Sequence, residues 1–128
     1  MFVKRAMPRI LVIDDNRDMR DLLRVVLERD GYAVDVAADG EEGLQIQSAR
    51  PADVVITDIF MPNRDGLETI GRLRAEHPRV KVLVISGGGD VVRGTSYLST
   101  AREIGAHAVL PKPFDLPALL ATVRGLIT

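Results

Sequence analysis

Short runs rich in valine and isoleucine recur along the chain, and a longer segment with a different pattern separates each run from the next. Runs dominated by β-branched and aliphatic side chains are typical of strands. We therefore predict a strand for each of the five runs. They are Arg9–Ile13, Ala33–Ala37, Asp53–Thr57, Lys81–Ser86 and His107–Leu110.

The segments between the runs have the periodicity of helices. In the first of them, five apolar residues recur at intervals of three or four: Met19, Leu22, Leu23, Val26 and Leu27. The other segments are each bounded by glycine, proline or a capping acid. The predicted helices fall within residues 17–31, 40–51, 65–78, 92–105 and 115–127.

Strict alternation of strands and helices determines the fold class. It implies right-handed crossovers and a parallel sheet that helices cover on both faces. The first, third and fourth runs are almost continuously hydrophobic, as strands at the centre of such a sheet are. We predict a flavodoxin-like doubly wound (βα)5 fold of the α/β class, with a five-stranded parallel sheet in the order 2-1-3-4-5.

Length and composition limit the number of domains and the classes of function. With 128 residues, 46% of them hydrophobic, the chain is expected to form one domain over residues 9–128 after a flexible extension, residues 1–8. The formal net charge of −1 argues against nucleic acid or a membrane surface as the main partner. The chain has no cysteine, and no apolar stretch approaches the roughly 18 residues of a membrane span. We expect a cytoplasmic protein.

Polar residues stand where the predicted strands end. Because the carboxyl ends of parallel strands share one edge of the sheet, these side chains are predicted to gather in one crevice. Two carboxylates about 4 Å apart repel by roughly 4 kcal/mol at an effective dielectric of 20, so the cluster must take up a proton or bind a cation. Carboxylate oxygens suit Mg²⁺. The residues are Asp14, Asp15, Asp58, Ser86 and Lys112.

An aspartate in such a crevice has a chemical use. Beside a bound divalent cation it can attack a phosphoryl group and form an aspartyl phosphate, and Asp58 is the candidate. The ammonium group of Lys112 and the hydroxyl group of Ser86 can hold further phosphoryl oxygens. The sequence therefore indicates phosphoryl chemistry at this edge of the sheet.

Four motifs resemble the receiver domain of bacterial two-component response regulators. In chain order they read ILVIDDN, VVITDIFMPNRDG, VLVISGG and PKPF. Each motif is weak when taken singly, but four of them in register at the ends of the predicted strands strongly indicate the family. The likeness extends from about Arg9 to the last residue.

The resemblance implies how the metal and the phosphoryl group are bound. Asp58 would be the phosphoacceptor, Asp14 and Asp15 would bind Mg²⁺ with it, and the backbone carbonyl of Phe60 would complete the protein ligands. Such a domain is a phosphorylation-controlled signalling switch rather than an enzyme. Its expected partners are a sensor histidine kinase or a histidine phosphotransfer protein as donor, and a downstream protein or an output domain missing from this chain.

The resemblance also extends to the residues around the acceptor. Ser86 matches the family's hydroxyl position, and Lys112 matches its lysine, whose bond to the next residue, here Pro113, is usually cis. Pro62 and Gly66 match the proline and glycine of the loop that follows the acceptor.

Three positions bear on how this chain switches. Val109 stands where the family commonly has a tyrosine or phenylalanine, so phosphorylation is expected to be reported by loop and helix movement rather than by an aromatic rotamer. Phe60 and Gly88 occupy positions that often tune the hydrolysis of the acyl phosphate. An apolar Phe60 is expected to hinder the attacking water.

Other interpretations are open at this stage. Asp14, Asp15 or Asn16 could cap the first helix, because side-chain oxygens are the usual acceptors at that position. The segment SGGGD, residues 86–90, could be the phosphate loop of a flavodoxin-like domain that binds a flavin or nucleotide. A Mg²⁺-dependent phosphatase that works through an aspartyl phosphate is the second alternative.

Overall fold

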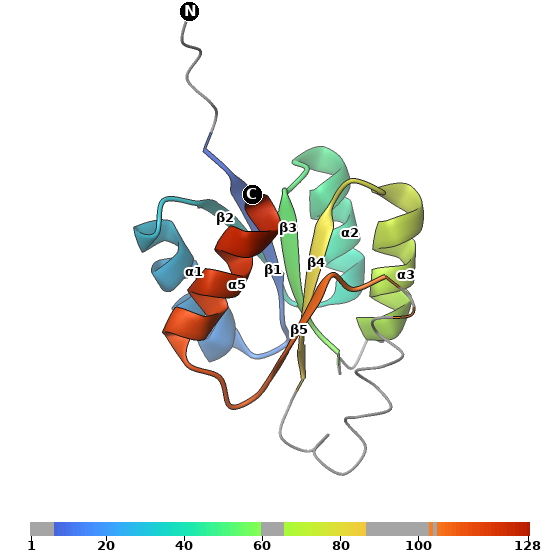
Figure 1. Ribbon diagram of the computed structural model, residues 1–128. Helices are drawn as coiled ribbons and strands as arrows, with labels where there is room; N and C mark the ends of the chain where they lie inside the picture. The colour runs from blue at the N-terminus through green and yellow to red at the C-terminus, as the bar shows by residue number, and fades with distance from the viewer. Residues whose placement is uncertain (1–6, 60–65, 87–102, 104) are drawn as a thin grey trace, which may run out of the picture.

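A five-stranded parallel sheet forms the centre of the molecule. The computed structural model describes residues 7–59, 66–86, 103 and 105–128. The strands are hydrogen-bonded in the order β2-β1-β3-β4-β5, which confirms the predicted flavodoxin-like topology (Figure 1). They are β1 (Arg9–Ile13), β2 (Ala33–Ala37), β3 (Val54–Asp58), β4 (Lys81–Ser86) and β5 (Ala108–Pro111).

Two strands begin and end one residue later than the sequence predicts. β3 extends to Asp58 because that residue still pairs with Ile85 of β4, and β5 extends to Pro111, which pairs with Ser86. Asp58 is therefore the last residue of a central strand and not the first residue of a loop. Its backbone position is fixed by the sheet.

Four helices lie within the described part of the chain, and none of them is long and apolar enough to cross a bilayer. The predicted helix in residues 92–105 falls outside the described residues, apart from Glu103 and Gly105. The residues expected to form a flexible extension are described only at Met7 and Pro8. The helices are α1 (Arg17–Arg29), α2 (Gly40–Ala49), α3 (Gly66–Glu76) and α5 (Leu116–Ile127).

The sheet is covered on both faces, as Figure 1 shows, with α1 and α5 on one face and α2 and α3 on the other. Side chains of β1 alternate between the two cores: Ile10 and Val12 pack with the α1 and α5 side chains, whereas Leu11 and Ile13 pack with those of α2 and α3. Burial on both faces explains why the central strands are hydrophobic throughout.

Not all of the regularly spaced apolar residues of α1 are buried. Leu23 and Leu27 are fully buried, but Leu22 is 45% exposed. Successive helical residues lie about 100° apart, and with Leu23 directed at the sheet Leu22 lies toward the edge of the buried stripe. Leu22 is thus an apolar residue on the exposed side of α1.

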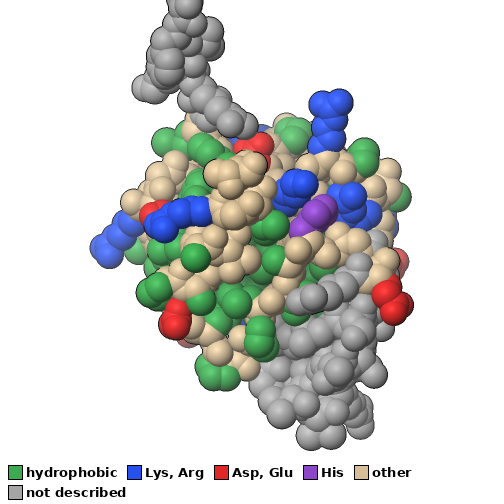
Figure 2. All heavy atoms as spheres, viewed as in Figure 1, with side chains coloured by type: hydrophobic (Ala, Val, Ile, Leu, Met, Phe, Trp, Pro, Cys, Tyr) green, Lys and Arg blue, Asp and Glu red, His purple; other side chains and the backbone are tan. Residues whose placement is uncertain are grey.

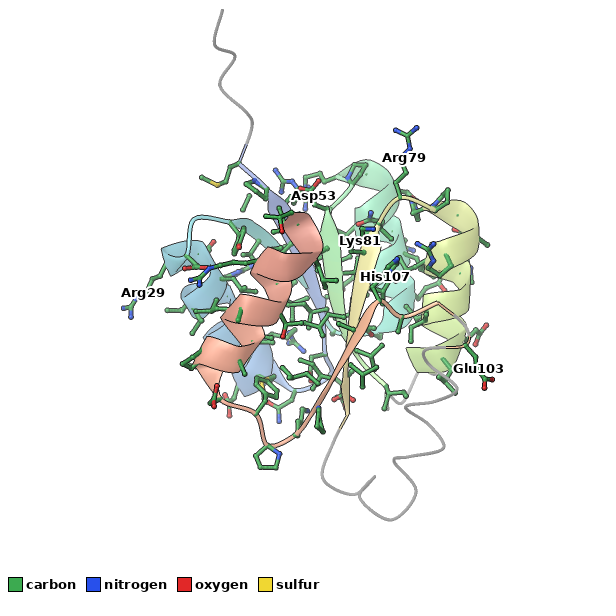
Figure 3. The ribbon with its side chains drawn as sticks, viewed as in Figure 1. Arg29, Asp53, Arg79, Lys81, Glu103 and His107 are labelled. Atoms are coloured by element: carbon green, nitrogen blue, oxygen red, sulfur yellow. The ribbon has the colours of Figure 1, made fainter. Side chains whose placement is uncertain are left out.

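His107 connects the amino ends of β4 and β5. Its backbone N–H donates to the Val82 carbonyl at 2.8 Å, and its Nδ1 accepts from the Val82 N–H at 3.1 Å. Partial burial of the ring and the cations of Arg74 and Lys81 lower the pKa of His107. Lys81 lies beside it in Figure 3, and Figure 2 shows a histidine bordered by Lys and Arg side chains. His107 is thus a structural hydrogen-bond acceptor for β4.

The His107 contact predicts a pH dependence of stability. Because the folded-state pKa is lower than the ordinary 6.5, the unfolded chain binds more protons in the window below that value. The free energy of unfolding should fall as the pH is lowered through this window, and His107→Gln should have a shallower slope. Urea unfolding at a series of pH values measures both. Equal slopes for the two proteins would contradict this account.

Candidate functional site

Three carboxylates meet at the carboxyl ends of β1 and β3. Asp14 and Asp15 follow β1, and Asp58 ends the neighbouring strand β3. One oxygen atom from each residue can be chosen so that all three lie within 4.8 Å of one another. The structure thus brings together the three acids that the sequence analysis selected.

The three carboxylates differ in exposure because of where they stand in the sheet. Asp14 and Asp58 are 2% and 7% exposed, whereas Asp15 is exposed. The Asp14 backbone N–H donates to the carbonyl of Ala37 at 3.0 Å, which extends the β1–β2 pairing by one residue. The site is a buried pair of acids with a third acid at its open side.

Lys112 brings a positive charge to this cluster from the end of β5. Its Nζ lies 3.1 Å from Asp58 Oδ2 and 3.9 Å from Asp14 Oδ2. The Lys112–Pro113 peptide bond is cis, as the resemblance implies. The Lys112 ammonium offsets only part of the charge of three ionised carboxylates.

The burial of Asp14 affects the ionisation of its carboxyl group. It raises the pKa of the Asp14 carboxyl above its ordinary value, because the charged form loses hydration. A hydrogen bond from the Asn16 N–H to Asp14 Oδ1, at 2.8 Å, and the Lys112 charge act in the opposite direction, whereas Asp58 and Asp15 raise the pKa further. The cluster is therefore an electrostatically costly arrangement that a bound cation would relieve.

The donor set fits a hard divalent ion. Carboxylate oxygens are preferred by Mg²⁺, which usually keeps several waters and takes only one or two protein carboxylates together with phosphate oxygens. The exposed Asp15 leaves one side of the cluster open to solvent. Asp14, Asp15 and Asp58 could hold such an ion.

The N-cap of α1 is Asn16, so Asp14 and Asp15 are not used to cap the helix. Asn16 is the N-cap, and its Oδ1 accepts a hydrogen bond from the Met19 N–H at 3.0 Å. Of the three capping candidates in the sequence, the amide residue is therefore the one used. Neither Asp14 nor Asp15 is needed for this purpose.

The first residue of α3, Gly66, lies directly against the end of β3. Its N–H donates to the Ile59 carbonyl at 3.0 Å. A Cβ atom built on Gly66 would lie 2.5 Å from the carbonyl oxygens of Asp58 and Ile59. Only glycine allows α3 to begin this close to the backbone of Asp58.

The remaining candidate residues are described less fully. Ser86 ends β4 beside Pro111, and its side chain lies outside the described part of the structure. Phe60, Pro62 and Gly88 lie outside it entirely. Val109 is half-buried and packs against the core between the sheet and helices α2 and α3.

Sequence reasoning missed two features of the site. The Nη1 atom of Arg20 donates to the Asp14 carbonyl at 2.8 Å. A groove of about 490 Å³ lies next to the Lys112–Pro113 segment and is lined mainly by apolar side chains of α1 and of the segment leading into α5. Both arise where α1 meets another part of the chain, and the spacing of residues within one segment does not reveal such contacts.

The comparison with known proteins agrees with this geometry. The family model described as the response regulator receiver domain matches residues 10–124. The chain belongs to this family. Receiver domains are the regulated modules of two-component systems and bind Mg²⁺ at an acidic pocket, which the Asp14, Asp15 and Asp58 cluster resembles.

Curated receiver-containing proteins and solved receiver domains are both similar to the chain. Response regulator MprA of Mycolicibacterium vanbaalenii is 40% identical over 119 residues, which are 93% of this chain and 50% of MprA. The chain thus spans about half the length of the curated relatives it matches. The receiver domain of NtrX from Brucella abortus superposes with a TM-score of 0.85 at 29% identity, covering 92% of this chain and 97% of that domain. Chemotaxis protein CheY4 of Vibrio cholerae gives 0.84 at 28% identity, covering 94% and 99%.

The close approach at Gly66 predicts opposite effects for two glycine substitutions. Gly66→Ala should lower the free energy of unfolding by about 1–3 kcal/mol, because the new methyl group meets backbone atoms that cannot move independently. Gly125→Ala lies in α5, where the new Cβ would meet no described atom within 4 Å outside its own helical turn, and should raise it by about 0.5–1 kcal/mol. Urea unfolding compares the two variants. A neutral Gly66→Ala would show that the start of α3 is not held tightly against the backbone of Asp58 and Ile59.

Proposed function

We propose that this receiver domain is a switch in which Asp58 accepts a phosphoryl group from a phosphohistidine. The donor is a sensor histidine kinase or a histidine phosphotransfer protein. The observation that carries the proposal is the position of the Asp58 carboxylate: nearly buried, 3.1 Å from the Lys112 ammonium, and within 4.8 Å of two further carboxylates. Membership of the receiver family favours this regulatory role over a flavin site or a phosphatase.

The proposed transfer uses Asp58 as the nucleophile. An oxygen of Asp58 forms a bond to phosphorus while the phosphorus–nitrogen bond of the donor breaks, and the electron pair of that bond stays on the imidazole. Lys112 already donates to Asp58 Oδ2 and can follow the negative charge onto the phosphoryl oxygens. The Ser86 hydroxyl is proposed to make a further phosphoryl contact.

Asp14, Asp15 and Asp58 would hold Mg²⁺, with the Phe60 carbonyl as the further protein ligand. When bound, the ion supplies charge neutralisation for the phosphoryl oxygens. The protein's own contribution is to hold these carboxylates in place before the donor arrives. The arrangement on the adjacent central strands β1 and β3 supports this assignment.

Phosphorylation of Asp58 would act by shifting the domain between an inactive and an active conformation. To move a two-state protein from 1:99 to 99:1, phosphorylation must favour the active state by about 5.5 kcal/mol. Hydrogen bonds from Lys112 and Ser86 to a doubly charged group, at about 1.5–3 kcal/mol each, would together be of this order. Val109 has no aromatic ring to reorient, so loop and helix movement would carry the signal to a downstream protein or an output domain outside this sequence.

Tuning of the phosphoryl lifetime by Phe60 and Gly88 stays a prediction, which the dephosphorylation rate of Phe60→Asn tests.

The phosphoacceptor is identified by labelling with a small donor. Incubation with acetyl phosphate and Mg²⁺ should add the mass of one phosphoryl group, stable to acid and labile to base, and Asp58→Asn should not gain it. Asp53→Asn is the matched control, because Asp53 precedes β3 at its opposite end, far from the cluster (Figure 3). It should be labelled like the wild type. A phosphorylated histidine kinase should label the same residue, and labelling that persists in Asp58→Asn would refute the assignment.

A further inference from the structure

The backbone carbonyl of Asp14 has a side-chain partner from α1. Arg20, half-buried in the first turns of the helix, places its Nη1 atom 2.8 Å from this oxygen. An arginine side chain is long and pairs readily with negative groups. Here it donates to the neutral backbone carbonyl of Asp14, although the carboxylate cluster is close by. The hydrogen bond to a carbonyl, and not to a carboxylate, suggests a structural role for Arg20.

Arg20 completes a set of hydrogen bonds around the loop that carries the acidic pair. The Asp14 N–H donates to Ala37 at 3.0 Å, and the Asn16 N–H donates to Asp14 Oδ1 at 2.8 Å. The Asn16 carbonyl accepts from the Arg20 N–H at 3.0 Å. The loop is thus held on both sides of Asp15, and the Arg20 side chain holds the peptide between Asp14 and Asp15.

Asp15 is the residue that most needs such support. Its side chain is exposed, unlike those of Asp14 and Asp58, so packing does not fix its direction. The orientation of the Asp14–Asp15 peptide determines where the Cα–Cβ bond of Asp15 points. A fixed peptide therefore keeps the Asp15 carboxylate within reach of the other two.

We propose that Arg20 is a positioning residue for the acidic cluster: by holding the Asp14 carbonyl it directs the Asp15 carboxylate toward those of Asp14 and Asp58. The proposal rests on the proposed function of this cluster as a Mg²⁺ site. It makes the affinity for the ion depend on a residue that does not contact the ion.

The sign of the effect separates positioning from simple charge. If Arg20 acted only as a nearby cation, removing it would strengthen the binding of Mg²⁺ to the carboxylates. If it positions Asp15, removing it weakens binding, since partners of metal ligands typically contribute 10–100-fold in affinity. The two explanations predict opposite changes for the same variant.

The test measures the Mg²⁺ dissociation constant by calorimetry or NMR titration. Arg20→Met and Arg20→Gln should each bind Mg²⁺ on the order of tenfold more weakly than the wild type. Arg24→Met is the matched control, because it removes the same charge from the same helix one turn further from the loop. It should bind within about twofold of the wild type. Equal or tighter binding by both Arg20 variants would overturn the proposal.

A second measurement needs no metal. The Asn16 N–H is protected by its bond to Asp14 Oδ1, so its hydrogen exchange reports the order of the loop. Without Mg²⁺, exchange should be faster in Arg20→Met and unchanged in Arg24→Met, with circular dichroism confirming that both proteins are folded. A wild-type protein that does not bind Mg²⁺ would refute the proposed function. Unchanged Asn16 exchange in Arg20→Met would refute the positioning role, whether or not the wild type binds Mg²⁺.

Discussion

Mutual repulsion between three carboxylates at one edge of the sheet is the constraint on which the rest of the structure depends. In the unfolded chain such groups are hydrated and far apart. In the folded protein Asp14 and Asp58 are nearly buried and close together. Two adjacent strands of a parallel sheet bring them together, and the single ammonium of Lys112 offsets only part of their charge. A bound cation would relieve this cost, and the three acids are placed where they could hold one.

Several structural details keep that cluster in place. The hydrophobic strands β1 and β3 are packed on both faces, so their ends cannot shift to relieve the repulsion. Asn16 caps α1 and leaves both acids of the preceding pair unused by the helix. Gly66 lets α3 begin against the backbone of Asp58. These features hold the backbone of the strands and the loop from which the carboxylates extend, and the Asn16 N–H also donates to Asp14 Oδ1.

Much of this arrangement could be predicted from the sequence, because alternation and strand ends determine it. Hydrophobic runs located the strands, and the topology then required Asp14, Asp58 and Lys112 to meet. The one-residue shift of β3 could not be predicted, because pairing with β4 decides where the strand ends. The exposure of Leu22 and the contact of Arg20 depend on how α1 is rotated and on the path of the preceding loop. Spacing alone does not contain that information.

The free energy of unfolding as a function of Mg²⁺ concentration tests the central claim most directly. The wild type should become more stable by about 2.7 kcal/mol at one hundred times the dissociation constant. Asp15→Asn should be at least as stable as the wild type without the ion and should lose most of this response, whereas Asp53→Asn should keep it. A wild-type protein that Mg²⁺ does not stabilise, or an Asp15→Asn variant that responds like the wild type, would contradict a cation site built from these carboxylates.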